Sequence, residues 1–219
     1  TITITASENA TANVPISNVT IDTSGAAIAT SGKGNVNIEL DGTNTLKSGR
    51  EHAGLEKSGD GKLTITDENG NGKLIATGGQ YGAGIGGGFY EGGKNITIAG
   101  GKVTANGGDY GAGIGGGQEG DGSNITITDG EVIAAGGTNG AGIGGGGGIS
   151  GKGEKISISG DAKLKVQGGS GDYWDGAGAG IGNGGSHNGD YLSGTIPVNG
   201  AETEPDTSNL TTGKIEYYA

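Results

Sequence analysis

The sequence of 219 residues contains no cysteine and no methionine, and it has a single arginine, Arg50. The absence of cysteine excludes disulfide bonds and thiolate metal sites. No apolar run approaches the roughly 20 residues of a membrane-spanning helix, so we expect no membrane span. The net charge is −11, which would repel a phosphate backbone and disfavours a nucleic acid partner.

Proline is also scarce, with only three residues, whereas glycine accounts for 56 of the 219 positions. A collagen triple helix would need a strict Gly-X-Y pattern and more proline, so this fold is excluded. Apolar residues recur at regular spacing, which also argues against a flexible glycine-rich linker. The chain starts at Thr1 without a signal segment. We therefore expect it to belong to a larger protein that is extracellular or displayed on a bacterial cell surface.

The heptapeptide G-A-G-I-G-G-G occurs three times, at residues 82–88, 111–117 and 140–146. Its isoleucines, Ile85, Ile114 and Ile143, are separated by 29 residues both times. A fixed period of this length is typical of solenoids, in which each repeat is one coil that buries its apolar face against its neighbours.

Each 29-residue unit holds three short segments with alternating side chains, namely A-G-I, N-I-T-I and K-V-T-A. Alternation with a period of two predicts strands with one buried face, and the glycine pairs between segments allow tight corners. Because stacked coils place equivalent strands side by side in parallel, the sequence predicts an all-β fold. We expect a right-handed parallel β-helix of about six coils with three short strands per coil.

Apolar residues define three columns along this helix. The first column contains Ile28, Leu55, Ile85, Ile114, Ile143 and Ile181. The second contains Val36, Leu63, Ile96, Ile125, Ile156 and Leu192, and the third contains Val19, Leu46, Leu74, Val103, Val132, Leu164 and Ile196. A step of 38 residues between Ile143 and Ile181 makes room for an insertion.

Both ends of such a helix need covers, because open coils expose sheet edges. We expect a single β-helix domain over residues 1–200, with an N-terminal cap strand at residues 1–5. Residues 201–219 are predicted to form a polar loop and a possible final strand, with Ile215 and Tyr217 on one face.

The outward position of the first column is glycine in five of six coils, including Gly84, Gly113 and Gly142. Glycine inside a strand often marks close approach of a ligand or of another backbone. The flanking loops contain most of the aromatic residues, namely Tyr81, Phe89, Tyr90, Tyr110, Tyr173 and Trp174. A flat glycine strip with aromatic walls would suit the rings and hydroxyls of a polysaccharide. The alternative is that the loops cover the glycines, which then serve packing alone.

Acidic residues in the same loops could bind calcium, which prefers six to eight oxygen ligands. Asp109, Glu119 and Asp121 flank one predicted strand, and Glu91 could reach across from the preceding coil. The alternative is solvated surface charge, since the sequence has no D-x-D-x-D-G loop and no calcium-binding nonapeptide.

An enzyme is a further hypothesis, because the predicted fold resembles that of the pectate lyases and polygalacturonases. The lyases use an arginine base beside calcium, and Arg50 in G-R-E-H would be the candidate. The polygalacturonase signatures N-T-D, G-H-G and R-I-K are absent. His52 and His187 have no recognisable nucleophile partner in the sequence, so we assign no catalytic residue.

Two stretches carry a more specific resemblance, S-N-V-T-I-D-T-S-G-A-A-I at residues 17–28 and N-V-N-I-E-L-D-G-T-N-T-L at residues 35–46. They resemble the calcium-binding, carbohydrate-binding β-helix proteins of cellulolytic clostridia. The glycine-rich units resemble repeats in large surface proteins of gut Firmicutes. The clostridial resemblance implies a non-catalytic binder of acidic or cellulosic polysaccharide that uses Ca²⁺, but no acidic motif is shared that would carry its ligands over to this chain.

Three hypotheses follow from the sequence. The first is a non-catalytic extracellular module that binds polysaccharide, with Tyr81, Tyr110, Tyr173 and Trp174 at its site. The second is a structural stalk or adhesive repeat that binds a protein partner. The third is a polysaccharide lyase or hydrolase.

Overall fold

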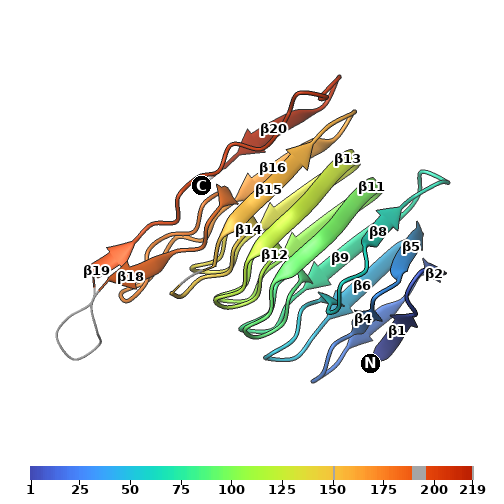
Figure 1. Ribbon diagram of the computed structural model, residues 1–219, viewed down its shortest axis with the longest axis horizontal. Helices are drawn as coiled ribbons and strands as arrows, with labels where there is room; N and C mark the ends of the chain where they lie inside the picture. The colour runs from blue at the N-terminus through green and yellow to red at the C-terminus, as the bar shows by residue number, and fades with distance from the viewer. Residues whose placement is uncertain (150, 189–195, 219) are drawn as a thin grey trace.

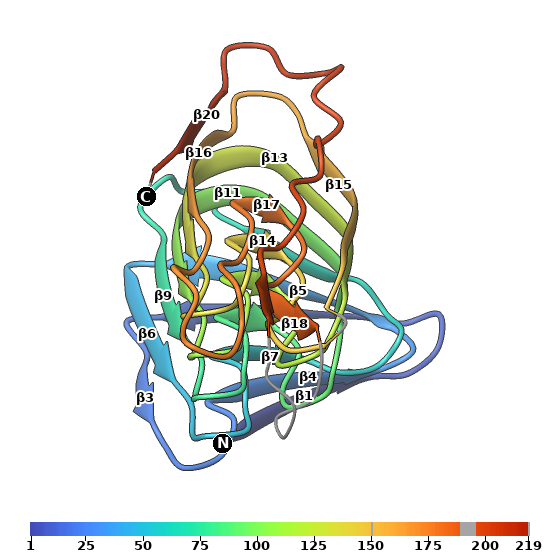
Figure 2. The ribbon, with the colours of Figure 1, turned by 90° about the vertical axis from the view of Figure 1, so that its left-hand side faces the viewer.

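The chain is a parallel β-solenoid of about six turns, described here for residues 1–149, 151–188 and 196–218 of a computed structural model. Successive coils lie side by side from the N-terminal to the C-terminal end (Figure 1). Viewed from the end, the coils enclose a common interior, and the loops that join the strands lie around its rim (Figure 2). The described residues contain strands and turns only, and they form no apolar helix of membrane-spanning length.

The first sheet has one strand from each coil, and all of its strands are parallel. Its order is β1 (Ile2–Ala6), β4 (Ile28–Gly32), β7 (Leu55–Lys57), β10 (Ile85–Gly86), β12 (Ile114–Gly115), β14 (Ile143–Gly144) and β17 (Ile181–Gly182). The segment expected as an N-terminal cap, β1, is thus the first parallel strand of this sheet.

The second sheet contains the other two columns. Its first part has β2 (Thr11–Ser17), β5 (Asn35–Asp41), β8 (Leu63–Thr66) and β15 (Gly153–Ile158). Its second part has β3 (Thr20–Asp22), β6 (Thr43–Lys47), β9 (Lys73–Thr77), β16 (Lys163–Gln167) and β20 (Lys214–Tyr217). Two long strands, β11 (Gly93–Asn106) and β13 (Gly122–Ala135), run through both parts. An antiparallel ribbon of β18 (Ser186–Asn188) and β19 (Ile196–Val198) lies apart.

The long strands mean that two coils have two strands instead of the expected three. The second and third columns join at Gly101 and Gly130, whose φ angles are 86° and 99°. The pairing register shifts between Ile98 and Lys102, so the corner is a bulge within a continuous strand. Glycine permits this left-handed backbone without steric strain.

The predicted first column is confirmed along its length, since all six of its residues are successive Cα partners. The second column is confirmed from Val36 to Ile156. Its last predicted member, Leu192, lies outside the described residues. Within these columns the isoleucine and leucine side chains are almost completely buried, and each stabilises the fold by roughly 1.5–3 kcal/mol relative to exposure.

The third column is confirmed from Leu74 to Leu164, but the prediction is wrong at both ends. Leu46 pairs with Ile21 and not with Val19. On its other side Leu46 pairs with Ala76 and not with the predicted Leu74, so the register is shifted by two residues. Such a shift keeps the same side chains inward, so the alternation in the sequence cannot reveal it.

At the C-terminal end, the partner of Leu164 is Ile215 in β20. The residue expected there, Ile196, instead starts the antiparallel strand β19. The chain leaves the coil after the first sheet and returns to the third column only with β20, because the β18–β19 ribbon and a polar stretch intervene. The final strand predicted near the C-terminus is therefore present as β20.

Of the two interpretations of the glycine strip, the structure supports the one in which the glycines serve packing, because Gly84, Gly113 and Gly142 are buried and the strip is not an open floor. A Cβ atom on Gly113 would lie 2.6 Å from the carbonyl oxygen of Gly142 and 2.7 Å from the amide nitrogen of Ala135. In the first coil the same position holds Ala27, which is fully buried in the core. These glycines let the ends of third-column strands pack directly against the first sheet.

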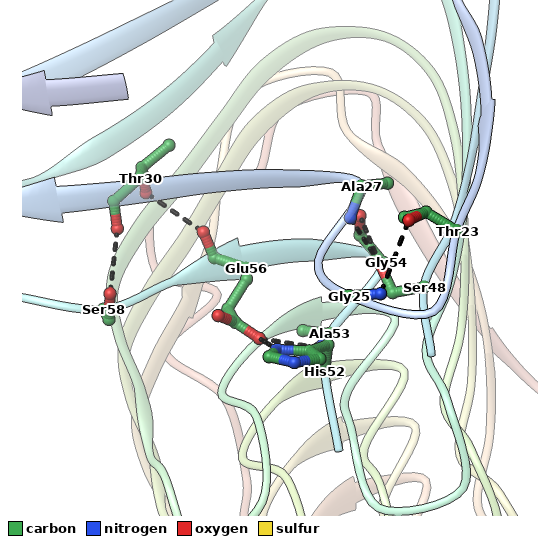
Figure 3. Close-up of polar contacts among 10 residues, drawn as sticks. All are labelled: Thr23, Gly25, Ala27, Thr30, Ser48, His52, Ala53, Gly54, Glu56 and Ser58. Carbon is green, nitrogen blue, oxygen red and sulfur yellow. Dashed lines mark hydrogen bonds and ion pairs between the residues drawn. The ribbon is translucent and has the colours of Figure 1, made fainter. Parts of the chain in front are cut away.

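The heptapeptide also forms a tight turn that is closed by one backbone hydrogen bond in each of its three copies. The amide of Ala83 donates to the carbonyl of Gly87 at 3.0 Å, and Ala112 and Ala141 repeat this bond with Gly116 and Gly145. In the preceding coil the amide of Ala53 donates instead to Oε2 of Glu56 at 3.2 Å. The Glu56 carboxylate, which is also 2.9 Å from Nδ1 of His52, thus replaces a glycine carbonyl (Figure 3).

We expect Gly113→Ala to lower the free energy of unfolding by about 1–3 kcal/mol, because its Cβ would collide with rigid backbone on two sides. Denaturant unfolding followed by far-UV circular dichroism would measure the change. Gly70→Asn is the matched control, since no atom lies within 4 Å of a Cβ there and asparagine tolerates the left-handed backbone. Equal stability of Gly113→Ala and the wild type would contradict this account of the heptapeptide.

The turn at Thr211 and Thr212 should loosen in acid before the coils unfold. Hydrogen bonds from Thr211 and Thr212 lower the pKa of the Asp161 carboxyl. A depressed pKa stabilises the folded form above the unfolded pKa, and this contribution disappears as the pH falls through the folded value. Amide exchange protection of Thr211 and Thr212 should therefore drop below pH 4 or so. In Asp161→Asn that protection should be low at every pH; a wild-type pH profile in this variant would contradict the assignment.

Candidate functional site

The predicted site residues Tyr81, Phe89, Tyr90 and Tyr110 form one aromatic group on the loops of two neighbouring coils. The ring centroid of Tyr81 lies 4.9 Å from that of Phe89 and 5.8 Å from that of Tyr110. The guanidinium of Arg50 lies 4.8 Å from the Tyr81 ring centroid. These rings cover one another, and within the group only Tyr90 is largely exposed, at 61%.

Tyr173 and Trp174 form a second group on the insertion between the third and first columns. Their ring centroids are 4.8 Å apart with an edge-to-face angle of 87°. Tyr173 is 80% exposed and Trp174 is 44% exposed. The Oδ1 atom of Asp172 accepts hydrogen bonds from the amides of Trp174 and Asp175, both at 2.8 Å. This turn holds the two rings at the tip of the loop.

Beneath the exposed rings the loop is anchored by buried polar contacts. Oδ1 of Asp175 lies 2.5 Å from Nδ1 of His187, and both side chains are buried. The amide group of Asn139 donates to the carbonyls of Asp175 and Gly176 at 3.2 and 3.3 Å. Because these contacts are shielded from water, they fix the loop base more strongly than surface contacts would.

The base of this loop borders a hollow of about 470 Å³ at the C-terminal end of the solenoid. Its lining residues are Val166, Gln167, Gly168, Gly169, Ser170, Ala177, Gly178, Gly180, Glu202, Tyr217 and Tyr218. Two exposed tyrosine rings, a carboxylate, an amide and a hydroxyl therefore face one concave space. Pockets of this kind, with apolar rings and a few polar groups, are the usual form of small-ligand sites.

A second hollow of about 600 Å³ adjoins the first, because both are lined by Glu202 and Tyr217. The Tyr217 ring covers Gly180, where a Cβ would lie 2.6 Å from a ring carbon. Burial, followed by the charges of Glu202 and Glu204, raises the pKa of Tyr217. An ordinary phenol, with a pKa of about 10, is already neutral at physiological pH, and this shift makes Tyr217 lose its hydrogen even less readily.

Glu202 has a structural role in addition to lining both hollows. Its carboxylate accepts hydrogen bonds from the amides of Gly180 and Ile181, at 2.7 and 3.1 Å. These bonds cap the exposed edge of β17. A carboxylate has about four lone-pair sites, so Glu202 can still accept hydrogen bonds from a ligand in the hollows that it lines.

The predicted calcium ligands Asp109, Glu119, Asp121 and Glu91 are not brought together. No three histidine, aspartate or glutamate side chains in the described parts of the chain lie close enough to hold a metal ion. Asp109 accepts a hydrogen bond from the amide of Gln80, and Asp121 accepts one from the backbone of Lys152. The reason is that each coil has two loops, which place Asp109 on one and Glu119 and Asp121 on the other.

Each of the two histidines contacts a carboxylate: His52 pairs with Glu56, and His187 pairs with Asp175. Both contacts hold loop backbone in place. The arginine considered as a lyase base donates to Gln80 at 3.0 Å and to the Tyr81 hydroxyl at 2.5 Å. Arg50 thus joins neighbouring loops of the first aromatic group.

The sequence analysis did not include Gln167, Glu202, Tyr217 or Tyr218, which line this hollow, among the candidate site residues. A signal was present in the pair Tyr217–Tyr218, since these two rings end a chain that is otherwise poor in aromatic residues. Their position beside the insertion could not be found, because it depends on β20 pairing with β16. That pairing spans about 50 residues with no repeat to mark the register.

Replacing the buried anchor should loosen the aromatic loop. We expect Asp175→Ala to destabilise the protein by about 1–3 kcal/mol, because it leaves buried partners without a hydrogen bond. Trp174 is the only tryptophan, so acrylamide quenching of its fluorescence reports on this loop and should increase. Asp109→Ala removes an exposed carboxylate from the corresponding loop of another coil and should change neither quantity. Unchanged quenching in Asp175→Ala would refute the anchor.

Comparison of the chain with protein-family models, with curated protein sequences and with solved structures finds no match. The assignment of function therefore depends on the geometry of the chain itself.

Proposed function

We propose that this protein is a non-catalytic extracellular module that binds polysaccharide at the C-terminal hollow. The observation that supports this most directly is the hollow of about 470 Å³ that Tyr217 and Tyr218 line at the base of the Tyr173–Trp174 loop. Sugar rings stack on aromatic faces, while their hydroxyls pair with amide, carboxylate and hydroxyl groups. Gln167, Ser170 and Glu202 supply these groups.

Pre-organisation supports the same proposal. The Tyr173–Trp174 loop is held from below by buried contacts of Asp175 and from within by the turn at Asp172. A platform that is ordered before binding loses little conformational entropy when a ligand arrives. The first aromatic group suits this role less well, because Tyr81 packs against Arg50, Phe89 and Tyr110.

Glycan-array screening followed by calorimetric titration of the best polysaccharide would test the proposal. We expect Trp174→Ala and Tyr218→Ala each to weaken binding roughly five- to tenfold, since a stacking contact contributes about 1 kcal/mol. Tyr90→Ala removes a ring from another coil that is more exposed, at 61%, and this variant is expected to bind as the wild type does. Loss of binding in Tyr90→Ala alone would place the site at the first aromatic group instead.

The same experiments separate the other hypotheses. A stalk or adhesive repeat would give no glycan on the array, and a lyase or hydrolase would release unsaturated or reducing ends during the titration. The clostridial resemblance implies that binding depends on calcium, and this stays a prediction. Repeating the titration in the presence of a chelator would test it.

A further inference from the structure

The two adjoining hollows at the C-terminal end of the solenoid carry negative charge. Glu202 lines both of them, and Glu204 lines the larger one together with Ile215 and Tyr217. The other polar side chains of their walls are uncharged, and no lysine, arginine or histidine is among the described residues that line them. The two hollows therefore present two carboxylates with no opposing charge in their lining.

The lysines of the last two third-column strands do not neutralise these carboxylates. Lys165 and Lys214 both contact Glu216, at 3.9 and 2.5 Å. The hydrogen bond and charge of Lys214, followed by the charge of Lys165, lower the pKa of Glu216. Because side chains alternate along a strand, Lys214 and Glu216 lie on the outward face of β20, whereas Ile215 and Tyr217 line the larger hollow. The two lysines are thus directed to a carboxylate on the other face of the sheet.

The ring of Tyr217 lies in the field of the two carboxylates. Burial raises the pKa of its phenol most, and the charges of Glu202 and Glu204 raise it further, with no lysine among the groups that act on it. Tyr217 is 54% exposed and Tyr218 is 41% exposed, so their rings are accessible from the hollows. Organic cations bind over aromatic faces within about 6 Å of the ring centroid. A cation in this space would meet aromatic rings and carboxylates together.

Both carboxylates have capacity left for a ligand. Each oxygen of Glu202 accepts one hydrogen bond, from the amides of Gly180 and Ile181, which leaves about two of its four lone-pair sites. The exposed side chain of Glu204 forms no hydrogen bond or ion pair within the parts of the chain that the structure describes. The hollows therefore suit a ligand group that donates hydrogen bonds and carries positive charge.

We propose that the polysaccharide bound at these hollows carries free amino groups, as a polymer of β-linked glucosamine does. This inference rests on the proposed function, because it names the class of polysaccharide for the same site. A protonated amine supplies a positive charge and three hydrogen-bond donors for Glu202 and Glu204, while the sugar ring stacks on a tyrosine. A polyuronate would place like charges against both carboxylates, which is unfavourable. The site thus selects against the acidic polysaccharides that the clostridial resemblance implies.

Calorimetric titration of the whole chain with three oligomers of equal length tests this inference. The oligomers are β-linked glucosamine, its fully N-acetylated form, which lacks the positive charge, and an oligogalacturonate. We expect the glucosamine oligomer to bind roughly fivefold more tightly than the acetylated form at low salt, and the oligogalacturonate to bind most weakly. The preference for the amine should shrink as salt is raised, because exposed ion pairs are screened.

A pair of variants with equal charge makes the result specific. Glu204→Gln removes a carboxylate of the larger hollow and should weaken binding of the glucosamine oligomer about two- to fivefold, with no change for the acetylated form. Glu68→Gln removes an exposed carboxylate from a loop of another coil and should bind both oligomers as the wild type does. Trp174→Ala and Tyr218→Ala should weaken binding of both oligomers alike, since stacking does not depend on the amine.

Equal binding of the glucosamine and acetylated oligomers, or equal effects of Glu204→Gln and Glu68→Gln, would overturn the inference. So would an absence of binding by the glucosamine oligomer. The proposed function would still stand in each case if another glycan binds and its binding depends on Trp174 and Tyr218, and it fails only if no glycan on the array binds.

Discussion

The structure depends on the close stacking of one backbone coil on the next. Most of the heptapeptide glycines have a neighbouring backbone atom within 3 Å of where a Cβ would be, and for Gly86 the carbonyl oxygen of Gly115 would be only 2.0 Å away. Glycine is thus required by contact between coils more than by the local turn. The cost is conformational entropy, since glycine has the most freedom to lose on folding. It is offset by the continuous aliphatic core and by the ladder of parallel hydrogen bonds.

This constraint also decides where function can lie. The interior is filled by aliphatic side chains, and the glycine corners leave no room for a ligand. Most polar side chains therefore lie on the loops, the outward faces of strands and the two ends, and Lys57 is a buried exception at 4% exposed. On the outward faces the coil spacing turns a single repeated residue type into a row, as with Lys73 and Lys102. On the loops, the same spacing brings side chains of neighbouring coils into contact, as with Arg50 over the Tyr81 ring.

The parts predictable from sequence are those that the repeat determines. Alternation and the 29-residue period correctly predicted the residues of the first column, because each inward isoleucine must contact the equivalent residue of the next coil. The outward assignment of Gly84 failed because strand alternation does not hold where the chain turns a corner. The register of Leu46 failed because a two-residue shift leaves the pattern unchanged. The contact of Asp175 with His187, and the position of Tyr218 and Gln167 at one hollow, could not be predicted, since they bring together segments with no shared repeat.

The candidate site lies where the repeat breaks, and there is a physical reason for this. A regular coil presents a nearly flat strand face, because each side chain is covered by its counterpart on the next coil. The insertion at residues 169–175 interrupts this pattern, and the tail places the bulky ring of Tyr217 where the four preceding coils have Val166, Ala134, Ala105 and Ala76. The Tyr217 ring packs over Gly180, the last glycine of the column, and a hollow remains beside it. A concave surface with exposed aromatic rings arises only because these two departures meet at the same end of the solenoid.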